Sequence, residues 1–389
     1  NGLEKRPKLR FPGFDEPWSI YKAEELFKNV ADKNHPMETV LTIIQGKGTL
    51  PREQAGRNIH YDDASLANYK KVEQGDFIIH LRSFEGGLEM ANEDGIVSPA
   101  YTILRCKKPH SSLFYEAYFH TDEFINHILS KSVEGIRDGR QISYEAFKWL
   151  GLPYCDVSEQ ERIAQLFCTL SHRIEKQQQM VDALKKYKRG LFNQIFSAIS
   201  KSSQCRKLRE LVRVSGGKTP SMSNSLYWNG DIVWISSKDM KSSRISGSEL
   251  KITNLALNEM TLYHPGTLLL VARSGILKHS LPLAILEVDA TINQDIKALQ
   301  VHGCNAFYLY YAILSQEDTI IRTLVKTGTT VQSLMMDSFL NIEIPTPDID
   351  QQQRIIDKLA KLEKYVEVQE KELSLLSQMR NGLLQQLFI

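Results

Sequence analysis

A short run of glycine, lysine and threonine is the stretch that most invites a catalytic interpretation. Gly217-Lys218-Thr219 looks like the end of a phosphate-binding loop, but that loop needs a glycine at position 212, where Val212 stands. The sequence also lacks His-Glu-x-x-His, Gly-x-Ser-x-Gly, Gly-x-Gly-x-x-Gly and the Asn-Pro-Pro-aromatic tetrapeptide of amino-methyltransferases. We therefore expect no intrinsic catalysis and assign no catalytic residue.

Metal ligands and redox-active thiols are equally sparse. The ten histidines are isolated from one another, and the cysteines form no Cys-x-x-Cys pair. The five cysteines are Cys106, Cys155, Cys168, Cys205 and Cys304. Such spacing predicts neither a disulfide framework nor a metal site, and it fits a reducing cytoplasm. No cofactor is expected in this chain.

The composition is that of a soluble globular protein with more than one domain. Of 389 residues, 42% are apolar and 24% are charged, and the net charge is +2. No apolar run approaches the roughly 18 residues that a membrane span needs, and we do not expect the charged start to be a signal peptide. The near-neutral charge predicts only local basic patches and weak DNA binding by the chain alone.

A long helical pattern occurs twice, 192 positions apart. Residues 158–196 and 350–388 share 11 identities in 39 aligned positions, against the roughly two or three expected from composition. The chain is therefore an internal duplication. Each copy is predicted to be one helix of about 55 to 60 Å.

Apolar residues in each copy are spaced four and three apart, which predicts a coiled-coil seam. We expect the two seams to pair. The seam residues are Ile163, Phe167, Leu170, Ile174, Gln177, Val181, Leu184 and Leu191 in the first copy, and Ile355, Leu359, Leu362, Val366, Gln369, Leu373, Leu376 and Leu383 in the second.

The fold class is predicted to be α/β, with two mixed α/β domains separated by the two long helices. Domain boundaries are expected at 1–152, 153–200, 201–345 and 346–389, with a small polar linker at 197–204 and an extended basic arm at 1–12. Helical patterns are expected at 18–30, 113–129, 207–214 and 307–314. Short strands are expected at 39–44, 77–81, 101–104, 234–236 and 267–272.

Several stretches in a fixed order carry a family resemblance over essentially the whole chain. They are Pro7-Lys8-Leu9-Arg10-Phe11-Pro12-Gly13-Phe14, Ser98-Pro99-Ala100-Tyr101, Gly216-Gly217-Lys218-Thr219-Pro220, Tyr227-Trp228-Asn229-Gly230-Asp231-Ile232-Val233-Trp234-Ile235, Arg273-Ser274-Gly275, Gly328-Thr329-Thr330, and the exits from Pro153 and Pro345 into the long helices. Together they resemble the specificity subunit of type I restriction-modification systems.

This resemblance implies two target-recognition domains in a pseudo-two-fold arrangement, each reading half of a bipartite site in double-stranded DNA. It implies an antiparallel coiled coil that holds the domains apart and docks two modification (methyltransferase) subunits. Restriction subunits would join the full complex, and S-adenosylmethionine, ATP and Mg would belong to these partners.

Two alternatives stay open at this point. A specificity subunit could serve a methyltransferase-nuclease fusion of another restriction type, or the duplicated helices could form a scaffold that binds proteins only. Loss of DNA affinity with salt discriminates DNA recognition from a pure protein scaffold.

Side chains that read bases or hold phosphates supply the candidate DNA-binding residues. In the first domain they are Lys47, Arg52, Arg57, Arg82, Ser83, Arg137, Arg140 and Gln141. In the second they are Lys218, Ser237, Lys238, Arg273, Ser274, Lys278, Lys326, Thr329, Thr330 and Gln332. Arg82 and Arg273 rank highest because they occupy equivalent strand ends in the two copies.

Two further groups of side chains have structural interpretations. The aromatic residues of 114–124 and 307–311 lie at helical spacing, which favours core packing. Gln177 and Gln369 lie near the middle of their seams, where antiparallel pairing could let them share hydrogen bonds and fix the register.

Overall fold

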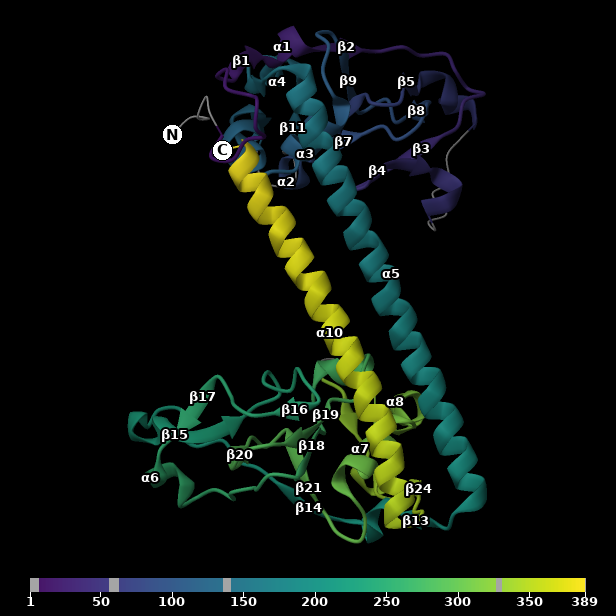
Figure 1. Ribbon diagram of the computed structural model, residues 1–389, viewed down its shortest axis with the longest axis vertical. Coiled ribbons are helices and arrows are strands. Elements are labelled where there is room, and N and C mark those ends of the chain that lie inside the picture. Colours follow the sequence, from purple (N-terminus) through teal and green to yellow (C-terminus); the bar gives the residue numbers. More distant parts are fainter. Residues whose placement is uncertain (1–6, 56–62, 136–140, 327–330, 389) are drawn as a thin grey trace. The chain divides into compact units, whose positions relative to one another are not determined.

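The computed structural model describes residues 7–55, 63–135, 141–326 and 331–388 (Figure 1). Its chain divides into two compact units. Unit 1 comprises residues 1–179 and 371–389, and unit 2 comprises residues 180–370. Each unit therefore contains a mixed α/β body together with a part of both long helices, so the predicted α/β class with two long helices is confirmed.

The two long helices match the duplicated pattern, with one correction. Helix α5 spans Val157–Ser202 and helix α10 spans Ile349–Phe388. Residues 197–202 continue α5, so the predicted linker at 197–204 is wrong over most of its length. Ile199 explains the difference, because it is buried in the core of unit 2 and extends the apolar face of the helix by one more turn.

Parts of α5 and α10 pack side by side within each unit, drawn in teal and yellow in Figure 1. In unit 1 the rings of Phe167 and Phe388 stack with centroids 6.0 Å apart, and Arg173 pairs with Glu372 at 3.1 Å. In unit 2 the paired residues are Lys185 with Glu370 at 2.6 Å, and Lys188 with Glu363 at 2.7 Å. Residue numbers rise along one helix as they fall along the other, so the pairing is antiparallel within each unit.

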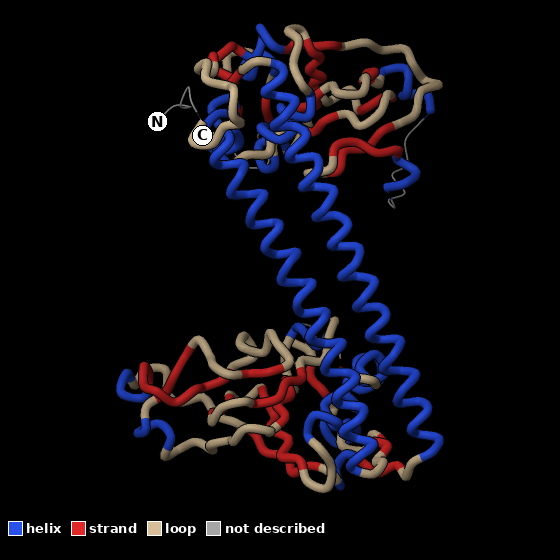
Figure 2. The backbone as a smooth tube through the Cα atoms, in the orientation of Figure 1, coloured by secondary structure: helices blue, strands red, loops and turns tan. Residues whose placement is uncertain are grey.

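Unit 1 is built on a four-stranded antiparallel sheet, shown in red in Figure 2. Its strands, in spatial order, are β2 (Phe27–Val30), β9 (Thr102–Cys106), β6 (Phe77–Ile79) and β7 (Glu89–Met90). Two-stranded ribbons surround it, and these are β1 (Ser19–Lys22) with β12 (Gly151–Tyr154), β3 (Leu41–Ile44) with β4 (Gly48–Pro51), β5 (Lys70–Val72) with β8 (Gly95–Val97), and β10 (Val133–Glu134) with β11 (Gln141–Ile142). The short helices are α1 (Ala23–Leu26), α2 (Ser83–Gly86), α3 (Ser112–Phe119) and α4 (Tyr144–Phe147).

Unit 2 repeats this plan with a larger sheet. The strands, in order, are β14 (Val212–Gly216), β21 (Ile296–Val301), β18 (Leu268–Val271), β19 (Leu283–Leu286) and β16 (Arg244–Ile245). A three-stranded sheet of β17 (Leu250–Ile252), β15 (Trp228–Ile235) and β20 (Ala290–Ile292) adjoins it, with ribbons of β13 (Cys205–Lys207) and β24 (Glu343–Pro345), and of β22 (Val325–Lys326) and β23 (Ser333–Leu334). Helices α6 (Asn254–Leu257), α7 (Ala306–Leu314), α8 (Glu317–Leu324) and α9 (Met336–Phe339) complete the unit.

The cores of both units are aromatic and include the long helices. In unit 1, Tyr115, Phe119 and Phe124 of the 114–124 segment are fully buried, and in unit 2, Tyr308 and Tyr311 are buried in the same way. Their predicted core role is confirmed. Among the described residues, no helix is long and apolar enough to span a membrane.

Two local predictions are wrong because pairing with distant segments overrides local pattern. Residues 18–30 form β1, the single-turn α1 and β2, since β1 pairs with β12 and β2 with β9. Residues 207–214 likewise contain strand residues that pair with β24 and β21. The described part of the basic arm is held in unit 1, where the Arg10 guanidinium pairs with the Glu159 carboxylate at 2.7 Å.

Candidate nucleic-acid interface

The candidate residues of unit 2 gather where several strands end. Strands β15 and β20 are parallel, with Ile235 opposite Ile292, so their carboxyl ends lie at the same edge. The Lys218 N–H donates to the Ile292 carbonyl at 3.0 Å, and the Asn293 N–H donates to the Ile235 carbonyl at 2.9 Å. Lys218 therefore lies beside the loop that carries Ser237 and Lys238.

The same edge continues through the end of β18. The Ala272 N–H donates to the Asp295 carbonyl at 2.8 Å, which joins this strand end to the loop after β20. Arg273 forms a β-bridge with Ser333, and Ser333 pairs with Lys326 across the β22–β23 hairpin. We call this continuous row of loops the unit 2 edge, and its predicted members are Lys218, Ser237, Lys238, Arg273, Ser274, Lys278, Lys326 and Gln332.

A short helical turn orients part of this edge. Ser274 is the N-cap of the 3-10 turn Gly275–Lys278, and its hydroxyl accepts from the Ile276 N–H at 3.4 Å. The Ser274 N–H in turn donates to the Gln332 carbonyl at 3.1 Å. Arg273 and Lys278 thus project from a backbone that is hydrogen-bonded on both sides.

Five cations of the unit 2 edge are available to an anionic ligand. Lys218, Lys238, Arg273, Lys278 and Lys326 are all exposed. Within the described ranges none of them forms an ion pair of the kind that Lys185 and Arg244 of the same unit form with glutamates. Exposed bases without a carboxylate partner are what binding a row of phosphates requires.

In unit 1 a buried carboxylate positions Lys47. The Glu89 side chain is 0% exposed and accepts from the Gly46 N–H at 2.7 Å and the Gly48 N–H at 2.8 Å. These contacts clamp the turn between β3 and β4, and Lys47 projects from it into solvent. Gly46 and Gly48 have φ of 74° and 75°, a region that favours glycine.

Glu89 is kept ionised by its surroundings. Burial alone raises the pKa of Glu89, but His120 and the two glycine N–H groups outweigh it, so its pKa lies below the usual range. Burial lowers the pKa of His120, yet Glu89, whose Oε1 lies 3.3 Å from Nε2, raises that pKa overall. Sequence reasoning missed both residues, and the only signal was an acid inside the apolar run Leu88-Glu89-Met90-Ala91.

Arg82 and Gln141 lie near this turn. The Gln45 side chain covers Gly86 of α2, so the β3–β4 turn lies against that helix. Helix α2 starts directly after the exposed Arg82 and contacts β11, which carries the exposed Gln141. We call Lys47, Arg82 and Gln141 the unit 1 edge.

Two candidates of unit 1 have side chains that are buried or packed against the unit. Ser83 is 0% exposed and its hydroxyl accepts from the His80 N–H at 2.9 Å, so it stabilises the strand end instead. Arg52 is half-buried, with its guanidinium over the Tyr69 ring at 6.0 Å, a packing contact. Five candidates lie outside the described residues, namely Arg57, Arg137, Arg140, Thr329 and Thr330.

The seam residues of both helices are buried or half-buried. Buried members are Ile163, Phe167, Leu170, Gln177, Val181, Ile355, Leu359, Val366 and Leu376. Half-buried members are Ile174, Leu184, Leu191, Leu362, Gln369, Leu373 and Leu383. Gln177 belongs to unit 1 and Gln369 to unit 2, so their shared hydrogen bonding stays a prediction.

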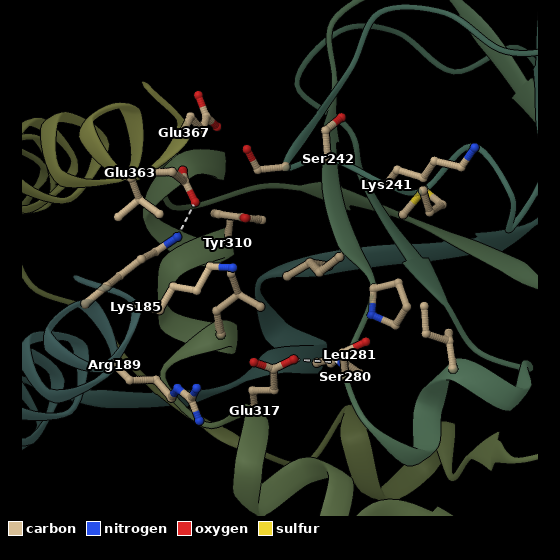
Figure 3. Close-up of a pocket in the computed structure, with 18 of the residues that line it drawn as sticks. Lys185, Arg189, Lys241, Ser242, Ser280, Leu281, Tyr310, Glu317, Glu363 and Glu367 are labelled. Atoms are coloured by element: carbon tan, nitrogen blue, oxygen red, sulfur yellow. Dashed lines mark hydrogen bonds and ion pairs between the residues drawn. The ribbon is translucent and has the colours of Figure 1, made fainter. Parts of the chain in front are cut away.

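An open cleft of about 1060 Å³ lies in unit 2 between the helices and the loop that carries Ser237 and Lys238 (Figure 3). Two ion pairs line it, because Lys185 binds Glu370 and Lys188 binds Glu363. The cleft also lacks a nucleophile paired with a base. Across the described part of the chain, no cluster of three or more His, Cys, Asp or Glu side chains could hold a metal ion.

Comparison with known proteins agrees with this geometry. Residues 200–378 match the type I restriction modification DNA specificity domain family. The type I restriction enzyme EcoR124I/EcoR124II specificity subunit of Escherichia coli is 32% identical over 252 residues, 62% of this chain and 62% of that protein. The MjaIX specificity subunit of Methanocaldococcus jannaschii is 30% identical over 197 residues, 49% of this chain and 45% of that protein. The chain thus spans less than two thirds of either relative.

A solved structure extends the likeness of fold to the whole chain. The S subunit of the type I restriction-modification system from M. genitalium superposes with a TM-score of 0.60 at 15% identity, over 98% of this chain and 99% of that one. The resemblance to type I specificity subunits is confirmed, and residues 200–378 match the DNA specificity domain family.

Proposed function

We propose that this chain, whose residues 200–378 match the type I restriction modification DNA specificity domain family, recognises a bipartite target in double-stranded DNA. Each unit would read one half-site with its edge. The chain itself would be non-catalytic and would act in the cytoplasm, as the specificity subunit of a larger complex.

The observation that carries this proposal is the unit 2 edge. Five exposed cations, which have no ion-pair partner among the described residues, lie in segments that backbone hydrogen bonds join into one row. Cations held this way can neutralise consecutive phosphates. Arg273 could also read guanine, and Gln332 beside it could read adenine. The unit 1 edge supports the same role with Lys47, Arg82 and Gln141.

The chemistry would belong to partner subunits. Two modification subunits docked on the long helices would transfer a methyl group from S-adenosylmethionine to adenine. Restriction subunits would use ATP and Mg for translocation and cleavage. This assignment fits the cleft of unit 2, where the described side chains offer ion pairs and no catalytic constellation.

The test is to co-express the chain with the modification subunit of its own system and to map methylated adenines across the host genome. We expect methylation confined to one motif with two short specified halves and an unspecified gap. Co-purification without any methylated motif would contradict DNA recognition. Failure of the two proteins to associate would instead favour a different partner.

Salt dependence gives a second measurement on the same complex. If the five cations of the unit 2 edge each neutralise one phosphate, the logarithm of the binding constant should fall with the logarithm of salt with a slope of about −4 to −5 from unit 2 alone. The Arg273→Ala variant should make that slope shallower by about one. An affinity that does not change with salt would contradict phosphate binding.

A further inference from the structure

The loop of residues 218–226 holds two large aliphatic side chains in solvent. Met222 is 67% exposed and Leu226 is 68% exposed. The loop directly follows β14 and begins at Lys218, so it is continuous with the unit 2 edge. None of the residues predicted from the sequence to bind DNA lies between positions 219 and 236.

Two tryptophans fix the base of this loop. The Trp234 indole N–H donates to the Lys218 carbonyl at 3.1 Å, and the Trp228 indole N–H donates to the Ser221 carbonyl at 3.1 Å. The two rings pack edge to face, with centroids 5.2 Å apart. A Cβ added at Gly217 would lie 2.0 Å from the Ile292 carbonyl oxygen, so the loop leaves the sheet in close backbone contact.

The far end of the loop is held equally well. Asn224 caps the 3-10 turn Ser225–Tyr227 and accepts from the Leu226 N–H at 3.2 Å. Thr253 donates its hydroxyl to the Leu226 carbonyl at 2.8 Å and its N–H to the Tyr227 carbonyl at 3.0 Å. The aliphatic side chains therefore project from an ordered backbone, which lowers the entropy lost when a ligand binds them.

The amino-acid composition of the loop indicates which kind of ligand it could bind. Residues 217–230 contain no Asp or Glu, and they combine Lys218 with four small hydroxyl side chains. Lysine, serine and threonine are phosphate-contacting residues, while Met and Leu can lie against a thymine methyl group or enter a base step. The absence of acids and the continuity with the unit 2 edge both favour duplex DNA over a protein partner.

We propose that the 218–226 loop is a specificity-determining DNA contact of unit 2, in which Met222 and Leu226 lie against base pairs while Lys218 and the hydroxyls hold the flanking phosphates. This inference rests on the proposed DNA-recognition function. It assigns to unit 2 an apolar mode of base reading in addition to the polar contacts of Arg273 and Gln332.

A photo-crosslinking amino acid tests the contact in the complex of the full chain with its modification subunit. Leu226→p-benzoylphenylalanine should crosslink to one half-site of the methylated motif. Leu250→p-benzoylphenylalanine is the matched control, because Leu250 is an exposed leucine of β17 outside the loop. A crosslink from position 226 to the modification subunit, or none at all, would overturn the inference.

A double substitution supplies an independent readout. M222S/L226S should weaken binding to the motif about tenfold or relax one half-site, with the other half-site unchanged, while L250S should change neither. Because both side chains are exposed, the thermal unfolding of the variant should match that of the wild type. Replacing thymine by uracil in that half-site should weaken wild-type binding and have little further effect on M222S/L226S.

The outcomes of these experiments distinguish failure of the proposed function from failure of this inference alone. A wild-type complex that methylates no bipartite motif overturns the proposed function and this inference with it. Wild-type methylation combined with an unaltered motif and affinity in M222S/L226S overturns the inference alone.

Discussion

Units 1 and 2 share the order and pairing of four sheet strands, which we call the frame. They differ in the loops at the edge of that frame. The sheet order β2-β9-β6-β7 of unit 1 recurs as β14-β21-β18-β19 in unit 2, with antiparallel pairing throughout. After the first of these strands, unit 1 inserts the β3–β4 hairpin and unit 2 inserts the 218–226 loop. The insertions start at matching places, since Val40 bridges Ile96 of β8 and Lys218 bonds to Ile292 of β20. The duplicated frame therefore constrains where the inserted hairpin or loop starts. It does not constrain which side chains that insertion carries.

Buried polar anchors show how closely the frame is repeated. Gln160 accepts from the Ser111 N–H before α3 at 3.0 Å, and Gln352 accepts from the Asn305 N–H before α7 at 2.9 Å. Each amide also donates to a carbonyl five residues earlier in the chain. Tyr115 adds a bond to the Pro153 carbonyl, and its counterpart in unit 2 does the same with Pro345. These bonds fasten each long helix to the α/β body of its unit.

The largest effect is expected from the repeated phenylalanine at the end of each helical pattern. Phe388 is buried among Trp18, Phe114 and Phe167, and its counterpart Phe196 packs on Tyr308. Phe388→Ala and Phe196→Ala should each destabilise their own unit by about 3 to 5 kcal/mol. Calorimetry of the full chain should show the affected unit unfolding earlier. Equal losses in both units from a single variant would contradict the division into two compact units.

The Glu89–His120 pair should distinguish unit 1 from unit 2. Glu89→Gln leaves His120 without its ionic partner and should destabilise unit 1 by about 3 kcal/mol. The stabilisation from Glu89, whose pKa is lowered from 4.5, is present above that value and is lost as pH falls through the folded pKa. The contribution of His120, whose pKa is raised from 6.5, is present below that value and is lost as pH rises through the folded pKa.

The difference in melting temperature between wild type and Glu89→Gln should therefore be largest between about pH 4.5 and 6.5 and should narrow on both sides. A difference that does not narrow above about pH 6.5 would show that the carboxylate acts through its hydrogen bonds to Gly46 and Gly48 and not through His120. His120→Ala is the matching variant, and its effect should not add to that of Glu89→Gln.

The glutamine anchors should behave alike in both units. Gln160→Leu and Gln352→Leu each leave a part-buried N–H and a buried carbonyl without a partner, which should cost about 2 kcal/mol in the respective unit. Gln353→Leu is a control, because Gln353 is exposed on the same helix. A loss in only one unit would show that the repeated geometry is not equally important to both.

Arg82→Ala and Arg273→Ala should cause the smallest change in free energy among these variants. Their effect should be confined to DNA recognition. Each should weaken DNA binding by about tenfold and relax the methylated motif in one half-site only, a different half for each variant. Thermal unfolding should be unchanged because both side chains are exposed. If both variants relax the same half-site, the two edges do not read separate halves.

Sequence periodicity predicted the long helices well because their repeated apolar spacing is local information. The limits of α5 and α10 agree with the pattern except at 197–202, where burial of Ile199 extends the helix beyond a stretch that looks like a linker. Strand pairs such as β1 with β12 join residues more than 100 positions apart, which no local pattern encodes. For that reason residues 18–30 and 207–214 were predicted as helices.

The candidate interface was only partly predictable for the same reason. Residue types suggested Arg273, Lys326 and Gln332, and the structure brings these together through bonds between distant strands. Ser83 had an equivalent position to Ser274, but only the structure shows that it is buried. Glu89 could not be chosen from sequence, because its role depends on the N–H groups of Gly46 and Gly48, which lie 43 and 41 positions away.

The burial of Phe388 has a consequence for the order in which the chain folds during synthesis. Unit 2 consists of one continuous segment, so every residue that it needs has left the ribosome soon after residue 370. Unit 1 cannot complete its core until Leu384, Leu387 and Phe388 arrive, although most of it is made first. Unit 2 should therefore reach its native state before unit 1, the reverse of the usual N-terminal-first order. A ribosome stalled with residue 370 exposed would carry a folded unit 2 and an uncovered apolar surface on unit 1.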